Sequence, residues 1–432
     1  MNKKNIVVDS ITVFVLSIVS RIIFTVLIAS NNPNYFYSAD TKTYHDLSCN
    51  LLKYGTFIID KADNPGIFRT PGYPLFLAFV YSIFGINSLP VIIFQIILSS
   101  IGCVLLYYML SRMFDRWVAL TGAFLYLLDM PSIYYSNKIL SETLFTCIFI
   151  AFIFAFTLFF EKQKYIYIVV SGLLLGIVTL IRPVTYYLVI FLFVAYFAKQ
   201  IKKGIGHFII FTLMYMCVVM PWVFRNYTVA GYCGISAAKE LNLCNFKGAW
   251  IEMARRQEHD IYKIQEELIA EVGKRLRENN MEDNALNRTL IRGAIGKKIL
   301  FSNIPLFINY QIRFTADVLF STGMDLMAEV FLNTSAENFE NQSWFVSADV
   351  KYLIYLIILY LFVIIGVIAT LKKQKIQQFS PLLLILLYMV AIHGEFDGRS
   401  RFRVPIMPLI IIFFCLGLSE ISQKIKLSKL DV

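Results

Sequence analysis

The chain has 432 residues, of which 58% are hydrophobic and 16% aromatic, whereas only 16% are charged. Soluble domains carry about one quarter charged residues, so this composition excludes an ordinary soluble protein and indicates a membrane protein. The net charge of +11 would suggest a nucleic-acid partner in a soluble chain, but most Lys and Arg stand in short segments between apolar runs, where a membrane topology explains them and no nucleic acid is expected.

Ten apolar runs are long enough, or nearly so, to cross a bilayer as helices. We place them at residues 7–30, 89–111, 117–133, 140–160, 165–180, 183–198, 207–224, 350–371, 379–393 and 404–420. The first follows the basic segment MNKKN as in a signal peptide, but its length and the lack of a clear small-residue cleavage site favour a retained span. The runs 165–180 and 183–198 are close to the minimum of about 17 residues. Only Ile181 and Arg182 separate them, so one bent helix is the alternative, and it would reverse the sidedness of everything downstream.

Basic residues decide between these two topologies. With ten spans, the segments MNKKN, SRMFDR, EKQKY, KQIKKG, LKKQKIQQ and QKIKLSK all lie inside, and each carries at least two Lys or Arg, as the positive-inside rule requires. We therefore predict an all-α polytopic protein of the cell membrane, with about ten transmembrane helices and cytoplasmic N- and C-termini. Its parts are an N-terminal transmembrane module (1–225) whose first outer loop (31–88) holds interfacial helices, a mostly helical extracytoplasmic loop region (226–349), and a C-terminal transmembrane module (350–432).

The first outer loop contains FYSADTKTYHDLSCNLLKYG, which predicts a short amphipathic helix at the membrane surface. Ser38 suits the N-cap, which puts Asp40 in the first turn, where the helix dipole favours its ionised form. Gly55 suits the C′ position that ends the helix. The apolar stripe has 3-4-3 spacing and consists of Tyr44, Leu47, Leu51 and Tyr54. Asp40 is either a helix-terminal decoration or a functional carboxylate. The following FRTPGYPLFLAFVYSIFG adds Arg69 and a second interfacial helix to the same loop.

Two further acidic residues flank predicted spans on the outer side. Asp129, in LYLLDMPS, ends the third span, and Glu142, in ILSETLF, begins the fourth. Both could converge on the site of Asp40. Equally, both could be features of helix ends, because Asn137 or Ser141 can cap a helix and an acid is favourable in its first turn.

Arginine is frequent near the outer ends of the predicted spans, where the positive-inside rule disfavours it. A single outer arginine can simply extend its charge to the headgroups, but a set of guanidinium forks at headgroup level suits a phosphate or pyrophosphate. The outer set comprises Arg69, Arg182, Arg225, Arg399, Arg401 and Arg403. Arg21 lies within the first span instead, where a charge is costly unless it is paired or hydrated.

The second outer loop contains IEMARRQEHDIYKIQEELIAEVGKRLREN, whose pattern loosely predicts an amphipathic helix, and IPLFINYQIRFTADVLF, which suits an interfacial helix rather than an eleventh span. Cys233 and Cys244 share this polar loop and could pair. Other cysteines lie in apolar runs, as packing residues do, and no spacing resembles a zinc site. No cofactor is indicated, and these residues neither require nor exclude a divalent metal.

Several motifs, taken in chain order, resemble those of the GT-C superfamily of polytopic glycosyltransferases. Its members include the protein O-mannosyltransferases (glycosyltransferase family 39) and the bacterial lipid A aminoarabinose transferases. The motifs are ADTKTYHDLSCNLLKYG, FRTPGYPLFLAFVYSIFG, ILSETLF, GLLLGIVTLIRP, MPWVFRNYTVAG and RSRFRVPIMPLI. Each is weak alone, but the ordered set runs along most of the chain and is fairly specific.

The resemblance implies a membrane glycosyltransferase that transfers a hexosyl or pentosyl group, with inversion, from a polyprenyl-phosphate-linked donor. The acceptor would be a lipid, glycan or protein on the outer face of the membrane. The family's catalytic first-loop acid corresponds to Asp40 and a second acidic position to Asp129, and Glu142 joins them as the third predicted catalytic residue. Many members carry Asp-Glu where this chain has Asp40-Thr41, a departure from the paired-carboxylate pattern. The predicted ligands of the lipid phosphate are Arg69, Arg182, Arg399, Arg401 and Arg403.

The chemistry of sugar transfer agrees with these separate roles for the acidic residues and the arginines. A sugar bound to a lipid phosphate leaves an anionic phosphate ester behind, so the site needs cations at the phosphate and one carboxylate to take the acceptor proton. Two alternatives remain. A polymerase or ligase of lipid-linked glycans typically has its own Arg and His set in a late outer loop, whereas His259 is the only His in the large loop here. A transporter or flippase of lipid-linked sugars predicts polar residues deep in several spans, where chiefly Arg21 is found.

Overall fold

The computed structural model describes residues 3–29, 35–59, 66–197, 201–324, 326, 343–372, 375–393 and 399–428. Every regular element in these ranges is helical, which confirms the predicted all-α class. The membrane part begins with α1 (Lys3–Ala29), α2 (Ala39–Tyr54), α3 (Gly72–Phe84), α4 (Ser88–Met113), α5 (Arg116–Leu127), α6 (Met130–Ser136), α7 (Glu142–Lys162), α8 (Tyr165–Ile181), α9 (Leu188–Phe197) and α10 (Ile201–Ala230).

The later helices divide into two groups. The second outer loop forms α11 (Ala238–Leu241), a π-helix (Asn242–Gly248), α12 (Ala249–Arg256), α13 (Ile261–Glu278), α14 (Ala285–Ser302) and α15 (Ile304–Phe320). The C-terminal group is α17 (Ser343–Thr370), α18 (Ile376–Ile392), α19 (Arg399–Arg403) and α20 (Met407–Ser428).

Six of the described helices are long and apolar enough to cross a membrane, and the number is seven if α5 and α6, which meet at a bend of 52°, form one broken span. The six are α1, α4, α7, α10, α17 and α20. The predicted spans 165–180, 183–198 and 379–393 coincide with shorter apolar helices at Tyr165–Ile181, Pro183–Phe193 and Gln378–Ile392. Each of the ten predicted spans therefore overlaps a helix, but the number ten is not confirmed, because four of these segments are short or bent.

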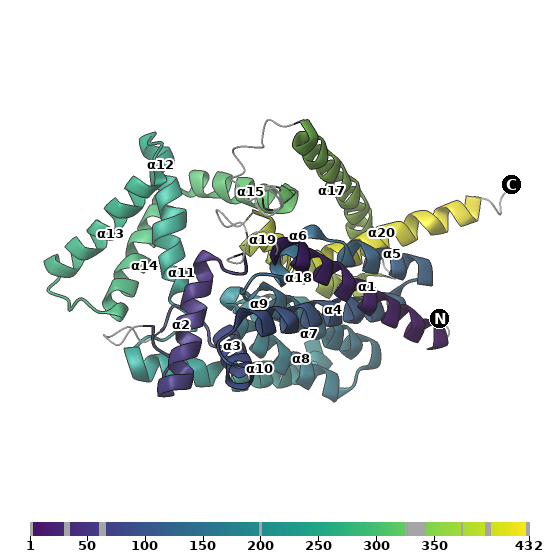
Figure 1. The fold of residues 1–432 in the computed structure, drawn as a ribbon, viewed down its shortest axis with the longest axis horizontal. Coiled ribbons are helices and arrows are strands. Elements are labelled where there is room, and N and C mark those ends of the chain that lie inside the picture. The colour runs from purple at the N-terminus through teal and green to yellow at the C-terminus, as the bar shows by residue number, and fades with distance from the viewer. Residues whose placement is uncertain are drawn as a thin grey trace.

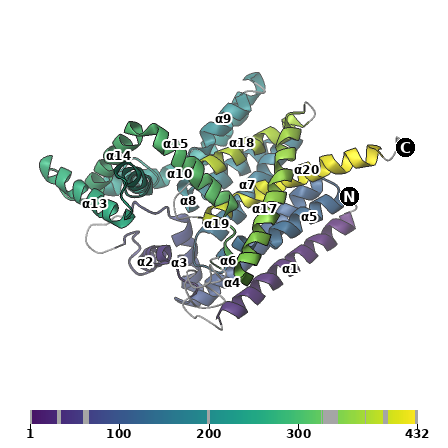
Figure 2. The same cartoon turned by 90° about the horizontal axis from the view of Figure 1, so that it is seen from above.

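The long helices run together as a bundle (Figures 1 and 2). α1 packs on α4, α4 on α7, α7 on α8, and α8 on α10, while α17 packs on α20. Gly366 and Gly417 allow the last pair to approach closely, because a Cβ on either would lie 2.0 Å from a backbone oxygen of the other helix; small residues have this role in membrane helix packing. Both marked chain ends lie on one side of the molecule, and α2 and α11–α14 lie on the opposite side (Figures 1 and 2).

The segment predicted as the second outer loop forms a small helical subdomain with its own apolar core. The predicted amphipathic segment is two helices, α12 and α13, because Gln257 adopts a left-handed conformation with φ 54°. The core consists of Cys244, Ala249, Ile264, Leu268, Val272, Leu276, Ile291 and Ile295. Cys233 is exposed and Cys244 is buried, and both are free thiols.

α15 follows this subdomain and has the features of an interfacial helix. It runs across the direction of α1 and α17 (Figure 2). Its residues Ile304, Ile308 and Ile312 recur every four positions and are 48%, 51% and 65% exposed. An exposed apolar stripe on a helix that lies across the bundle is what a membrane interface accommodates.

Candidate active site

The local sequence of the first outer loop explains how α2 presents Asp40. Ser38 is the N-cap of α2, as predicted, and its backbone N–H donates to Thr41 Oγ1 at 2.9 Å, a contact that the sequence did not predict. Gly55 ends the helix with φ 66°, and its N–H donates to Leu51 O at 3.0 Å. The apolar stripe is only half right: Tyr44 and Leu47 are buried, whereas Leu51 is half-buried and Tyr54 is 44% exposed. The helix begins and ends where the sequence indicates, so Asp40 stands in its first turn.

Asp40 is held by two arginines from distant parts of the chain. Its Oδ1 accepts from Arg69 Nη2 at 2.6 Å, and its Oδ2 lies 2.8 Å from Arg401 Nη1. Arg69 is steadied by α2 itself, since its Nε donates to Thr43 Oγ1 at 3.2 Å and its guanidinium lies 4.7 Å from the Tyr44 ring. The three charged side chains remain partly open, with 29% of Asp40, 27% of Arg69 and 21% of Arg401 exposed.

Arg401 links this pair to a second, buried carboxylate. Arg401 Nε donates to Glu142 Oε1, and Arg182 Nη1 donates to the same oxygen at 2.7 Å. The side chain of Glu142 is 0% exposed, and its other oxygen, Oε2, has no hydrogen-bond partner among the described residues. Glu142 is at the first position of α7, where the helix N-terminus also favours an anion. Arg401 therefore bridges an exposed acid and a buried acid.

The arginines decide the protonation state of Asp40. Burial raises the pKa of Asp40, but the attraction of Arg69 and Arg401 outweighs burial and lowers this pKa to about 2. Burial likewise lowers the pKa of Arg401, whereas Glu142 and Asp40 raise it above its ordinary value. Near neutral pH the site thus contains two carboxylates and three guanidinium groups.

Asp129 and Arg403, two other residues predicted for the site, have different contacts. Asp129 is the N-cap of α6, where its Oδ2 accepts from the backbone N–H of Ser132 at 3.0 Å. Arg403 is fully buried and donates to the carbonyl oxygens of Leu319 at 3.0 Å and Ser321 at 2.5 Å, at the C-terminal end of α15. Arg403 therefore fastens α15 to α19, the short helix that carries Arg401.

Of three further arginines that the sequence singles out, two lie apart from Asp40 and Glu142, and the side chain of the third is not described. The side chain of Arg399 is not among the described ones. Arg225 donates to Phe57 O at 2.7 Å and lies 4.9 Å from the Trp222 ring, so it holds the first outer loop against α10. Arg21 is fully buried among serine hydroxyls.

The structure adds two site residues that the sequence analysis did not name as ligands, Thr43 and Tyr44. Both contact Arg69. Residues three and four positions apart share one face of a helix, so both could have been found as neighbours of Asp40 once Asp40 was chosen. Among the described residues, no group of three His, Cys, Asp or Glu side chains is arranged to hold a metal ion.

The cluster has one more positive charge than negative, and its exposed edge carries Asp40, Arg69 and Arg401. Such an arrangement can bind an anion through guanidinium forks and can accept a proton on a carboxylate. From here on, "charged cluster" denotes Asp40, Arg69, Glu142, Arg182 and Arg401.

Comparison with known proteins adds two findings. A family model described as dolichyl-phosphate-mannose-protein mannosyltransferase matches residues 64–224, which include Arg69, Glu142 and Arg182. No curated protein matches the sequence.

One similar solved structure is the archaeal oligosaccharyltransferase AglB from Archaeoglobus fulgidus, in complex with an inhibitory peptide and a dolichol-phosphate. The TM-score is 0.54 and the sequence identity is 14%, and the match covers 97% of this chain and 51% of that chain. Its apo form has a TM-score of 0.55 and 13% identity over the same shares. ArnT from Cupriavidus metallidurans, in the apo state, has a TM-score of only 0.43 and 11% identity over 95% of this chain and 78% of that chain.

The chain thus spans about half the length of the archaeal enzyme, and identities this low show a common fold alone. The family match and this common fold together confirm the resemblance of the chain to the GT-C superfamily of polytopic glycosyltransferases.

Proposed function

We propose that the protein transfers a sugar from a polyprenyl-phosphate-linked donor to an acceptor on the outer face of the membrane, and that the charged cluster is the reaction centre. The observation that carries this proposal is the convergence of Asp40, Arg69 and Arg401 at an open edge. These residues come from the first outer loop and from α19, more than 300 residues apart in the chain.

The arginines would hold the phosphate of the donor. Arg69 and Arg401 present guanidinium groups beside the exposed carboxylate, and a guanidinium matches two phosphate oxygens at once. The family description and the solved oligosaccharyltransferase both name a dolichol phosphate. A net positive site open at one edge suits such a phosphate, whose polyprenyl chain stays in the bilayer.

Asp40 would act as the base. In the reaction, the bond between the anomeric carbon and the phosphate oxygen breaks, and the acceptor oxygen bonds to the same carbon from the opposite side. The acceptor proton passes to Asp40, and the bonding electrons leave with the lipid phosphate. A single displacement of this kind inverts the configuration at the anomeric carbon, whichever hexosyl or pentosyl group is transferred.

A resting pKa of about 2 makes Asp40 a weak base. Asp40 becomes more basic if the donor phosphate binds Arg69 and Arg401 in place of the carboxylate. Asp40 then loses its two cations and becomes a stronger base in the complex where a base is needed. This exchange requires that donor and Asp40 compete for the same guanidinium groups.

In this proposal Asp129 takes no direct part in the transfer, because its carboxylate caps α6. Glu142 serves as the buried partner that keeps Arg182 and Arg401 oriented. The cluster draws on the proposed N-terminal module (1–225) through four residues and on the proposed C-terminal module (350–432) through Arg401, so both modules are required for activity.

The test uses the full chain reconstituted in vesicles with a radiolabelled polyprenyl-phosphate sugar, starting with dolichyl-phosphate mannose. Peptide, glycan and lipid acceptors are added outside. Transfer of the label to an acceptor, with release of the lipid phosphate, supports the proposal. Movement of the labelled lipid between leaflets without transfer would instead identify a transporter and refute it.

A further inference from the structure

Several buried charged side chains lie outside the charged cluster, and two of them are Arg21 and Asp129. Arg21 on α1 is 0% exposed, and Asp129 at the start of α6 is 2% exposed. A charge in a membrane span is costly unless it is paired or hydrated. No ion pair joins Arg21 to a carboxylate within the described parts of the chain, so the way in which its charge is balanced needs an explanation.

Serine hydroxyls surround each of these charges. Arg21 Nε donates to Ser99 Oγ of α4 at 2.8 Å, and its Nη1 donates to Ser17 Oγ at 2.8 Å. On the other side, Ser132 Oγ donates to Asp129 Oδ2 at 2.5 Å. Ser99 thus contacts the cation directly, and Ser132 contacts the anion directly.

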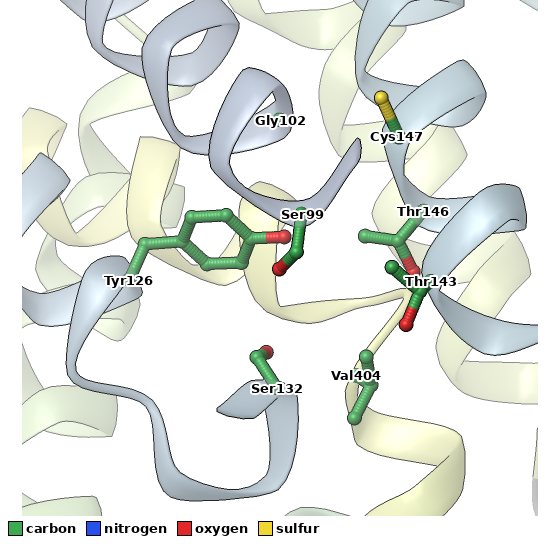
Figure 3. Close-up of a pocket in the computed structure, with 8 residues that line it drawn as sticks. All are labelled: Ser99, Gly102, Tyr126, Ser132, Thr143, Thr146, Cys147 and Val404. Carbon is green, nitrogen blue, oxygen red and sulfur yellow. The ribbon is translucent and has the colours of Figure 1, made fainter. Parts of the chain in front are cut away.

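A small cavity separates the two serines. It has a volume of about 10 Å³, close to the minimum that one buried water needs. Figure 3 shows the Tyr126 ring directed toward Ser99, with Ser132, Thr143 and Thr146 around the same space. The lining is Ser99, Gly102, Tyr126, Ser132, Thr143, Thr146, Cys147 and Val404, which includes five hydroxyl groups. The hydroxyl groups in this lining offer hydrogen-bond partners to a water, whereas purely apolar cavities stay dry.

The directions of the known hydrogen bonds fit one consistent arrangement in which that water joins Ser99 to Ser132. Ser99 Oγ accepts from Arg21, so its own proton is free to be donated into the cavity. Ser132 already donates its proton to Asp129, so its oxygen is free to accept. Thr146 donates to Glu142 O at 2.8 Å and can likewise accept. A water can therefore accept from Ser99 and donate to both Ser132 and Thr146.

We propose that one water occupies this cavity and completes a hydrogen-bonded chain from Arg21 through Ser99 and Ser132 to Asp129. Every proton in the chain points from the cation toward the anion, so each hydrogen bond polarises the next in the same direction. The two buried charges are then an ion pair joined through two hydroxyls and a water, which ties α1, α4 and α6 together.

The size of the cavity excludes larger occupants. A phosphate, carboxylate or hydrated cation does not fit in about 10 Å³. An ion would also disturb a set in which Arg21 and Asp129 already balance one another. The site is distinct from the proposed donor site, because none of its lining residues belongs to the charged cluster, and the inference does not depend on the proposed function.

The direct test is a density map of the unaltered protein, by cryo-electron microscopy or crystallography, at a resolution that shows ordered water. We expect a single peak within hydrogen-bond distance of both Ser99 Oγ and Ser132 Oγ. An empty cavity between ordered serines, or a direct contact between Arg21 and Asp129, would overturn the proposal.

A double-mutant cycle tests the chain independently, with unfolding in mixed micelles as the readout. Arg21→Met and Asp129→Asn should be coupled by roughly twofold or more in the unfolding equilibrium constant, the range found for residues that share one network. The coupling should disappear in a Ser132→Ala background. It should persist in a Ser100→Ala background, because the Ser100 hydroxyl is also buried on α4 but donates to Ile96 O at 2.9 Å. Equal coupling in all backgrounds would refute the water-mediated link.

Discussion

Replacing Asp40 by Asn separates the two tasks that we assign to the charged cluster. Asn has the size of Asp and remains compatible with the first turn of α2, so the helix should form as before. The substitution removes the base and, at the same time, removes the anion that occupies Arg69 and Arg401 at 2.6 and 2.8 Å. Transfer and donor binding should therefore change in opposite directions.

The magnitudes follow from the structure. The loss of a positioned base should reduce transfer by about 10²–10⁴-fold. The pKa of Asp40 falls from its ordinary value of 3.8 to about 2, which corresponds to about 2 kcal/mol of net attraction between the carboxylate and its surroundings. A donor phosphate must overcome this attraction in the parent protein but not in the variant. Donor binding should therefore become tighter, by roughly tenfold or more.

Both quantities are measurable on the same purified sample in nanodiscs. Donor affinity comes from equilibrium binding of a labelled polyprenyl-phosphate sugar, and transfer comes from single-turnover reaction of the bound donor. Asp46→Asn is the matched control, since Asp46 is on the same helix and no ion pair joins it to another described residue. The reasoning is refuted if Asp40→Asn transfers within a few-fold of the parent, or if its donor affinity falls.

Four other predictions follow from the same geometry. Arg401→Lys keeps the charge but loses the guanidinium fork, so donor affinity should fall about tenfold. The control is Arg112→Lys, which should bind the donor like the parent because Arg112 pairs with Glu161 outside the cluster. Equal donor binding by both variants would mean that Arg401 is only a membrane anchor. Glu142→Gln removes the charge that two arginines share in a fully buried position and should destabilise the protein by about 3 kcal/mol or more, measured by unfolding in mixed micelles; an unchanged stability would contradict the anchoring role. The folded pKa of Asp40 is about 2, so its ion pairs should stabilise the protein fully above about pH 4 and lose this effect as the pH falls toward 2. Asp40→Asn should therefore weaken the loss of stability at acidic pH. An unchanged pH dependence of stability would count against these ion pairs. A cysteine at Ala285, in an otherwise cysteine-free chain, should react with an impermeant thiol reagent in intact cells, and protection would overturn the assigned sidedness.

The sequence predicts the positions of helices in this chain better than it predicts their number across the membrane. Apolar runs locate a helix at each predicted span, because hydropathy reports burial in lipid or protein directly. It does not report bends or the depth at which a short helix ends. α5 and α6 are one predicted span, yet Leu128 and Asp129 break it by a 52° bend, and the Pro131 that follows sits in the first turn of α6. Length alone could not reveal this.

The charged cluster likewise has features that the sequence predicts and features that it does not. Local rules place Asp40 in the first turn of α2 and Glu142 at the start of α7, because caps and helix dipoles act over one turn. They do not indicate which arginines reach these acids. Arg401 and Arg403 are two residues apart in RSRFRVP, yet one reaches Asp40 and Glu142 and the other holds α15. Only the packing of α19 separates their roles.

The contrast between the two acids of the cluster explains why the site needs both. Glu142 is 0% exposed and shared by two arginines, and a buried charge held in this way is costly to unpair. Asp40 is 29% exposed, so water can replace a lost arginine at little cost. If a phosphate enters, Arg401 can therefore leave Asp40 but is held by Glu142, and it turns toward the phosphate without leaving the site. In the proposed mechanism, a single acid could not both retain the arginine and release it. A buried acid that holds Arg401 and an exposed acid that exchanges it would let the bound donor strengthen Asp40 as a base.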